Sequence, residues 1–184
     1  EAADITAASA AVVLNTGTPD EARFRTCLLC GKEAARLGRP VVLDPVGVGA
    51  SPWRLERVGA LLESFPVSIL RVNLGEARAL TGGGGGEAGV DSPAPASLEE
   101  RADAALALAR RYRTAVLLTG PEDLVADGES VQQVFGGSPR MTSVTGTGCM
   151  LSALCGVFAA VEPAPMAAAL LASAFWKTCA RRAE

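Results

Sequence analysis

Short, continuous runs of valine and leucine alternate along this chain with segments of helical character, and this alternation restricts the fold more than any other feature. Runs of this length are typical of strands buried on both faces of a sheet. Strands that alternate with helices form parallel sheets. We therefore expect an α/β fold with a central, mostly parallel sheet and helices on both faces. The expected strands are Ala11–Asn15, Pro40–Asp44, Ser68–Val72 and Ala115–Thr119.

The segments between these strands carry helix start and stop signals. Asp127-Gly128 is a hairpin signal and predicts that Asp123–Ala126 pairs with Ser130–Phe135. The apolar stretch Ala167–Trp176 predicts a buried helix. The expected helices are Pro19–Leu37, Leu55–Ser64, Leu74–Leu80, Leu98–Arg113, Thr147–Ala160 and Pro165–Arg181.

A glycine run, Gly82–Gly86, opens the only low-complexity segment and predicts a flexible surface loop reaching Ser97. Gly84, Gly86 and Gly89 fit GxGxxG, but the match follows a helix rather than a strand, which argues against a dinucleotide site. The length of 184 residues suits a single domain, 1–184. Both ends are abrupt, and we expect a fragment of a longer reading frame.

Composition excludes several classes of function. A formal net charge of −3 argues against a nucleic-acid or anionic-membrane surface. The absence of histidine excludes Ser-His and Cys-His dyads and histidine-containing zinc sites. Five cysteines, an odd number, argue against a disulfide framework, and Cys27 and Cys30 are expected in a core helix. With no signal peptide and no run long enough to span a membrane, a reducing cytoplasm is expected.

Polar residues cluster where the expected strands end. The clusters are Asn15 to Thr18, Asp44 to Gly47, Asn73 to Glu76, and Thr119 with Gly120. Ligands of parallel sheets bind beyond the carboxyl ends of the strands. We therefore expect the four clusters to form one site.

The turn Val144–Cys149, rich in glycine and threonine, runs directly into an apolar helical segment. The first N–H groups of a helix have no partner within it, and the helix dipole adds partial positive charge. Gly146, Thr147 and Gly148 are therefore candidates to hold a phosphate or the charge of a phosphoryl transition state. Cys149 adds a thiol at the same point. The alternatives are a helix cap without a ligand and a small buried cysteine.

Four further residues are candidates for nucleotide and metal binding. Asp44 and Glu76 suit Mg²⁺, which needs few protein carboxylates, although a turn before Pro45 and a charge in the first helical turn are the alternatives. Arg71, within an apolar strand, either pairs with nucleotide phosphates or extends to solvent. Thr119 offers a hydroxyl to a phosphate or ribose, or simply ends its strand.

Five motifs, in their order and spacing, resemble those of hydroxyethylthiazole kinases, which belong to the ribokinase-like superfamily. Leu14–Thr18 also resembles the strand-end motif of that family. The resemblance covers nearly the whole chain. The motifs are DPVGVGAS at Asp44–Ser51, RVNLGEA at Arg71–Ala77, LLTG at Leu117–Gly120, ADG at Ala126–Gly128 and VTGTGC at Val144–Cys149.

This resemblance implies a ribokinase-like fold and ATP- and Mg²⁺-dependent phosphorylation of the hydroxyl group of 4-methyl-5-(2-hydroxyethyl)thiazole, in thiamine biosynthesis or salvage. It implies that Gly146–Cys149 form the anion hole for the transferred group and that Gly146 also lies against the substrate. Cys149 stands where most ribokinase-like enzymes carry an aspartate base. Arg71 and Thr119 are then the residues that contact ATP.

The same resemblance implies that Asp44 and Glu76 organise Mg²⁺ and its water molecules. It also implies a homotrimer whose thiazole pockets lie between subunits and include the loop Asp44–Gly49. Val72 departs from the glycine usual before the motif asparagine, and the family's N-terminal and last C-terminal segments are absent. The alternatives are a hydroxymethylpyrimidine (phosphate) kinase, a non-catalytic nucleotide-binding relative and, less compatible with a chain lacking histidine, a cysteine-nucleophile hydrolase.

Overall fold

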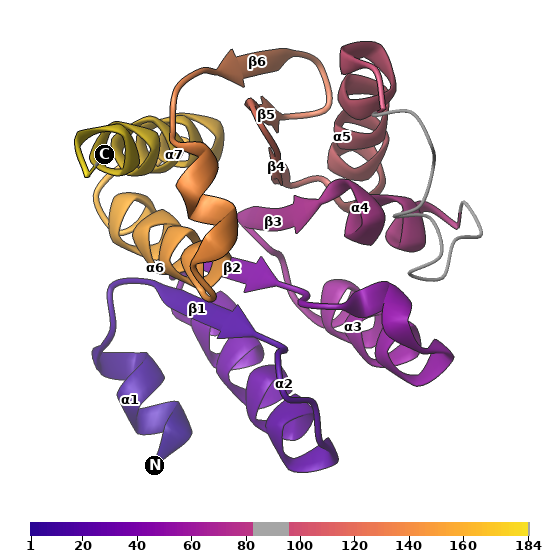
Figure 1. The fold of residues 1–184 in the computed structure, drawn as a ribbon. Coiled ribbons are helices and arrows are strands. Elements are labelled where there is room, and N and C mark those ends of the chain that lie inside the picture. The colour runs from indigo at the N-terminus through magenta and orange to yellow at the C-terminus, as the bar shows by residue number, and fades with distance from the viewer. Residues whose placement is uncertain (83–95, 184) are drawn as a thin grey trace.

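The computed structural model describes residues 1–82 and 96–183. Its centre is a six-stranded sheet whose strands lie side by side in chain order (Figure 1). The first three pairings are parallel and the last two are antiparallel, which confirms the mostly parallel sheet. The strands are β1 (Val12–Asn15), β2 (Val41–Asp44), β3 (Ile69–Asn73), β4 (Ala115–Thr119), β5 (Asp123–Ala126) and β6 (Val131–Val134).

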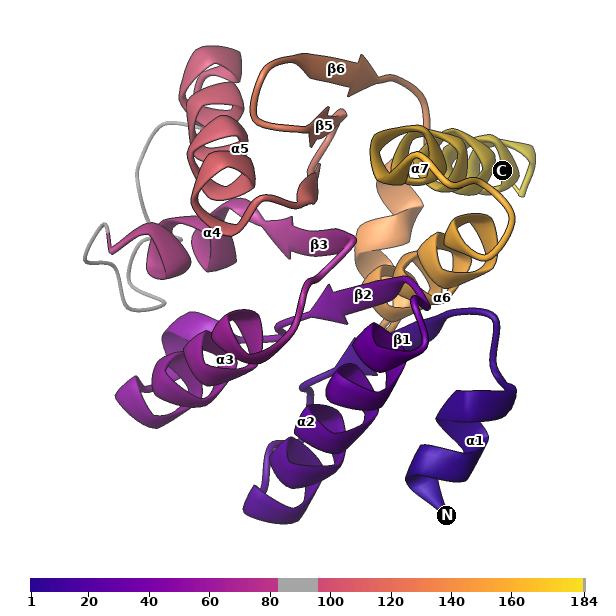
Figure 2. The same ribbon diagram turned by 180° about the vertical axis from the view of Figure 1, so that it is seen from behind.

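Helices cover both faces of this sheet, as expected (Figures 1 and 2). In β2, Val41 and Leu43 join the core formed with α2, α3, α4 and α5, whereas Val42 joins the core formed with α6 and α7. This alternation follows from the period of two of a strand. The helices are α1 (Ala2–Ala8), which packs on α2, then α2 (Glu21–Arg36), α3 (Pro52–Ser64), α4 (Leu74–Thr81), α5 (Leu98–Tyr112), α6 (Thr147–Ala159) and α7 (Pro165–Arg182).

The predicted hairpin is confirmed. Strands β5 and β6 pair antiparallel around a turn in which Gly128 has φ +96°, a conformation that favours glycine. Asp127 Oδ1 accepts the N–H groups of Glu129 and Ser130 at 3.0 and 2.9 Å. Aspartate stabilises turns in this way.

Three local expectations were incomplete. Helix α3 begins at Pro52 rather than Leu55, because Ser51 caps it by accepting the N–H of Arg54 at 3.2 Å. Helix α7 contains the predicted apolar stretch, but Leu171 and Phe175 on it are exposed. Two short 3₁₀ helices, η1 (Val48–Ala50) and η3 (Pro139–Ser143), were not predicted.

Cys27 and Cys30 lie on α2, with Cys27 buried in the core, as expected; burial raises the pKa of the Cys27 thiol. Apart from Gly82, which ends α4 at φ +82°, the glycine run through Gly86 and the GxGxxG match lie outside the described residues. Across the part of the chain that the structure describes, no helix combines the length and apolar character needed to cross a bilayer.

Candidate active site

The register of the sheet brings the predicted polar clusters together. Asn15 at the end of β1 is the partner of Asp44 at the end of β2, and Asn73 at the end of β3 is the partner of Thr119 at the end of β4. All four strands run parallel, so these residues meet at the carboxyl edge. The strand ends therefore lie together at one edge of the sheet, and the expectation that they form one functional site stays a prediction.

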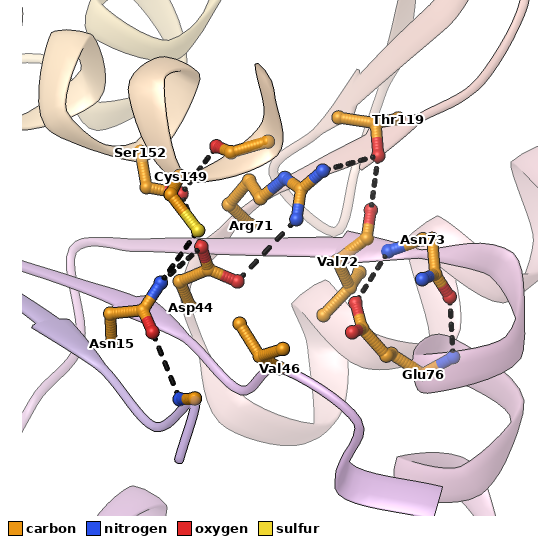
Figure 3. A network of polar contacts seen from close by, with 12 residues as sticks. Asn15, Asp44, Val46, Arg71, Val72, Asn73, Glu76, Thr119, Cys149 and Ser152 are labelled. Atoms are coloured by element: carbon orange, nitrogen blue, oxygen red, sulfur yellow. Dashed lines mark hydrogen bonds and ion pairs between the residues drawn. The ribbon is translucent and has the colours of Figure 1, made fainter. Parts of the chain in front are cut away.

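Asp44 is the centre of a hydrogen-bonded network at this edge (Figure 3). Its side chain is fully buried, and Oδ2 accepts from Ser152 Oγ at 2.7 Å and from Asn15 Nδ2 at 2.9 Å. The same Asn15 amide lies 3.3 Å from Cys149 Sγ. A buried carboxylate needs such donors, because an unpaired charge away from water is costly. Asn15 thereby links Asp44 to the thiol.

Arg71 extends this network toward β4. Its guanidinium lies 3.4 Å from Asp44 Oδ1 and donates to Thr119 Oγ1 at 3.1 Å. The side chain is only 13% exposed, so it does not extend into solvent from the strand end. Its Nε is buried and has no hydrogen-bond partner among the described residues. The guanidinium thus lies between Asp44 and Thr119, and its Nε–H donor is unused within the described residues.

Glu76 is held apart from this network by backbone donors (Figure 3). It forms a capping box with Asn73 at the start of α4, in which Oε2 accepts the N–H of Asn73 at 2.9 Å. Oε1 accepts the N–H of Gly47 at 3.0 Å and so ties the loop after β2 to α4. Burial raises the pKa of Glu76, opposed by these two hydrogen bonds and by the charge of Arg71. The structure therefore shows Glu76 directly as a charge in the first turn of α4, which was the alternative to a metal ligand.

The glycine-rich turn lies at the start of α6. Gly146 is the N-cap with φ +95°, and no side chain caps the helix. Gly148 lies against Arg71: an added Cβ would be 2.5 Å from its NH2. Cys149 is exposed, whereas Cys155, six residues later on α6, is buried, which raises the pKa of its thiol to about 12. The helix terminus therefore faces the guanidinium, with the exposed Cys149 beside it.

A cavity of about 560 Å³ opens at this point, a size usual for small-molecule sites. Arg71 and Thr119 line one part of it, and Thr147 and Gly148 another. The structure thus brings both predicted ATP contacts and two of the four predicted anion-hole residues to one cavity, whose described lining does not include Gly146 or Cys149. Asp44 lies beneath it, fully buried, and reaches it through Arg71.

The metal prediction rests on Asp44 and Glu76 alone. Over residues 1–82 and 96–183, no group of three or more histidine, cysteine or acidic side chains is arranged to hold a metal ion. Each oxygen of both carboxylates already accepts a hydrogen bond or pairs with Arg71. A role for these residues in holding Mg²⁺ stays a prediction.

Comparison with known proteins identifies the family. The model of the hydroxyethylthiazole kinase family matches residues 1–184. This chain belongs to the hydroxyethylthiazole kinase family. The hydroxyethylthiazole kinase of Shouchella clausii is 40% identical over 184 residues, which are 100% of this chain and 70% of that protein. The chain spans 70% of that protein's length and 57% of the length of the hydroxyethylthiazole kinase of Granulibacter bethesdensis, which is 48% identical over 160 residues, 86% of this chain.

Solved structures agree with this assignment. The hydroxyethylthiazole kinase protein of Pyrococcus horikoshii superposes with a TM-score of 0.79 at 37% identity, covering 93% of this chain and 63% of that one. A putative ribokinase of Agrobacterium tumefaciens superposes with a TM-score of 0.68 at 18% identity, covering 97% and 51%, and bears on the fold alone. The predicted ribokinase-like fold is confirmed.

Sequence reasoning missed three residues of this candidate site. Asn15 stood in a predicted strand-end cluster but received no role. Ser152 was missed, although it is a polar residue in the otherwise apolar α6, four positions after Gly148. Lys177 is buried and lines the cavity. It directly follows the apolar stretch of α7, and a single cation at the end of an apolar helical stretch was a signal of a buried charged residue.

Proposed function

We propose that this chain transfers the γ-phosphoryl group of ATP to the hydroxyl of 4-methyl-5-(2-hydroxyethyl)thiazole. One observation carries the proposal: the N-terminus of α6, through Thr147 and Gly148, lines one cavity together with the largely buried Arg71 at the carboxyl edge of the sheet. Cys149 follows Gly148 on the same helical turn and is exposed. Positioning and charge stabilisation dominate phosphoryl transfer, and this arrangement supplies both. The names of the similar proteins support thiazole as the acceptor.

On the nucleotide side, Arg71 and Thr119 face the cavity and are the proposed ATP contacts. The guanidinium of Arg71, held in place at the cavity, suits a phosphate, since arginine binds phosphate through several donors at once. Asp44 and Thr119 hold the guanidinium before the ligand arrives. The Arg71 side chain is therefore already ordered in the folded protein, and ATP binding does not lose the free energy of ordering it.

On the acceptor side, the substrate oxygen attacks the γ-phosphorus while the bond to the ADP oxygen breaks. The N–H groups of Gly146, Thr147, Gly148 and Cys149 stabilise the charge that develops on the transferred group. Gly146 lies against the thiazole, and Cys149, in its thiolate form, accepts the hydroxyl proton and becomes the thiol. Asn15 orients Cys149 through its amide, 3.3 Å from the sulfur.

Asp44 and Glu76 are the proposed residues for Mg²⁺. Their carboxylates are the oxygen ligands that this ion prefers, and both already accept donors of the chain, so contact through water molecules fits them best. The ion would neutralise charge on the ATP phosphates.

We further propose that the chain acts as a homotrimer with thiazole pockets between subunits, in the cytoplasm where ATP is supplied. The loop after β2 carries Gly47 with φ +64° and is the proposed contribution to a neighbouring pocket. An apolar outer face on α6 supports association. This face exposes Met150 and Val157.

The test is the mass of the products after incubation with Mg-ATP and either the thiazole alcohol or hydroxymethylpyrimidine. We expect phosphate on the thiazole alcohol alone. Phosphate only on the pyrimidine would favour the other kinase of the pathway. No phosphate on either alcohol, from a protein that still binds a non-hydrolysable ATP analogue, would favour a non-catalytic relative. A stable acyl-enzyme at Cys149 would contradict any kinase.

A further inference from the structure

A second buried ionic cluster lies in the wall of the cavity that the α6 terminus also lines. Asp123 at the start of β5 is 4% exposed. Its Oδ1 accepts the N–H of Gly120 at 3.0 Å and lies 3.4 Å from Lys177 Nζ, while Oδ2 accepts from Ser173 Oγ at 2.8 Å. Every oxygen of this carboxylate is therefore engaged, and its one cationic partner comes from α7.

Lys177 is equally buried, with 4% of its surface exposed. Besides Asp123, its ammonium group donates to the backbone oxygens of Pro121 at 3.0 Å and Gly120 at 3.4 Å. Gly136 and Gly137, at φ +108° and +86°, leave room for its methylene stem: a Cβ at Gly137 would lie 3.5 Å from Lys177 Cγ. The ammonium is thus fixed on the turn that follows Thr119.

Both members of this ion pair line the cavity that also contains Arg71 and Gly148. A carboxylate in the wall of a site for ATP would repel the phosphates, and the repulsion is strong where water is excluded. Three carbonyl or carboxylate acceptors point at this part of the cavity, and Lys177 satisfies all three. Without the lysine, the wall would present negative charge to an anionic ligand.

We propose that Lys177 sets the affinity of the cavity for the nucleotide by neutralising Asp123 and holding the Gly120 and Pro121 carbonyls. This inference rests on the proposed function, because it assumes that the cavity takes ATP. Lys177 acts through Asp123 and is a positioning residue. Its own three hydrogen-bonding partners leave it no donor for the phosphates.

Arg101 on α5 supplies a matched control. It is the other buried cation on the same turn, 8% exposed, and it donates to the backbone oxygen of Glu122 and pairs with the Glu122 carboxylate at 3.4 Å. A Cβ on Gly120 would collide with its guanidinium. Arg101 is absent from the described cavity lining, so removing it loosens the turn without changing charge in the cavity.

The experiment measures the Kd of a non-hydrolysable ATP analogue by calorimetry for the wild type, Lys177→Met, Asp123→Asn, Arg101→Met and the double variant Lys177→Met/Asp123→Asn. We expect Lys177→Met to raise the Kd about tenfold and the double variant to restore it to within about threefold of the wild type. Arg101→Met should lower the melting temperature but leave the Kd within about threefold.

Equal rises in Kd for Lys177→Met and Arg101→Met, or no recovery in the double variant, would overturn the inference in favour of a purely structural lysine. If Lys177→Met does not fold, the second measurement is the rate at which an acylating reagent modifies each lysine of the wild type. The two rates can be compared directly, because Lys32 and Lys177 are its only lysines. The ATP analogue should slow acylation of Lys177 and not of exposed Lys32. An equal rate at Lys177 with and without the analogue would overturn the inference.

The two proposals fail in different ways. A wild type that binds the ATP analogue but phosphorylates neither alcohol contradicts the proposed reaction, while recovery of binding in the double variant still supports Lys177. A wild type that phosphorylates the thiazole alcohol while Lys177→Met binds the analogue normally supports the reaction and overturns the inference. A wild type that neither binds nor reacts contradicts both.

Discussion

Gly148 is the glycine at the candidate site that lies against Arg71. An added Cβ would lie 2.5 to 2.9 Å from three guanidinium atoms of Arg71. The guanidinium cannot withdraw freely, because Asp44 and Thr119 hold it. We expect Gly148→Ala to lower kcat/KM for ATP about 100-fold by displacing Arg71 from its place beside the proposed anion hole.

Gly59→Ala is the matched control for this substitution. Gly59 lies within α3, and a Cβ there would meet no described atom within 4 Å. We expect unchanged kinetics and a gain in unfolding free energy of up to about 1 kcal/mol from the higher helix propensity of alanine. Wild-type kcat/KM in Gly148→Ala would contradict the assignment of the turn.

Asn15 joins the acceptor side to the buried carboxylate. Its amide donates to Asp44 Oδ2 at 2.9 Å and lies 3.3 Å from Cys149 Sγ. We expect Asn15→Ala to lower kcat about tenfold at saturating ATP, because one hydrogen bond to each group is lost. Asn15→Asp should be worse, since a second carboxylate would then face Asp44. An Asp variant as active as the Ala variant would contradict this role.

Two cysteines on α6 should differ sharply in reactivity. Cys149 is exposed, whereas burial raises the pKa of Cys155 to about 12, well above its usual 9.0. Because the thiolate is the reactive form, Cys155 should resist alkylation at about pH 8. A raised pKa also means that the stability contributed by Cys155 is present below pH 9.0 and is lost as pH rises toward about 12.

The measurement is iodoacetamide labelling followed by peptide mass spectrometry. We expect rapid modification of Cys149 and modification of Cys155 only when the protein unfolds, so that its rate rises with urea. Equal rates at both positions in the absence of urea would contradict the buried placement of Cys155.

At the scale of elements, the caps of α4 and α5 offer a paired test. Asn73 and Ser97 each form a capping box with the glutamate three residues later, Glu76 and Glu100. Only the Glu76 box is tied to the site, through the N–H of Gly47. We expect Asn73→Ala and Ser97→Ala each to lower the unfolding free energy by about 1 kcal/mol.

Activity should separate the two variants. Asn73→Ala frees Glu76 and with it the loop after β2, so kcat/KM should fall several-fold, whereas Ser97→Ala should leave it unchanged. Urea unfolding supplies the stabilities and initial rates supply kcat/KM. Equal activities in the two variants would show that the α4 cap serves stability alone.

Most elements could be predicted because local patterns determine them. The Val/Leu runs, the hairpin at Gly128 and the helix beginning at Leu98 need only period, turn and cap signals. The start of α3 could be predicted only by recognising Ser51 as an N-cap followed by proline. The 3₁₀ helices are too short to show a periodic pattern of apolar residues. Errors therefore lie where a few backbone contacts decide the conformation.

At the scale of the whole molecule, the sequence predicted where the candidate site lies but not which of its side chains form hydrogen bonds with one another. The rule that strand ends share an edge brought Asn15, Asp44 and Thr119 together. Which donor meets which oxygen depends on packing between elements far apart in sequence, such as Ser152 on α6 against Asp44, 108 residues away. Likewise, the pairing of Lys177 with Asp123 joins two elements that no local pattern relates.

The last prediction concerns assembly. The outer face of α6 exposes Met150 at 49% and Val157 at 63%, two turns apart, and Val161 just beyond the helix at 79%. Apolar side chains at this spacing form a stripe that association would bury. We expect light scattering to give about three times the 18.8 kDa of one chain. Val157→Glu should reduce the mass to one chain, because each trimer contact would then bury an unpaired charge.

The control is Leu98→Glu on α5, on the opposite face of the sheet, where a 50% exposed leucine lies outside the proposed contact. Its mass should match the wild type. If thiazole pockets lie between subunits, Val157→Glu should also lose transfer to the thiazole alcohol yet keep the wild-type Kd for the ATP analogue, since the nucleotide cavity is lined within one chain. A monomeric wild type, or a fully active monomeric variant, would contradict the shared pocket and place the whole reaction within one subunit.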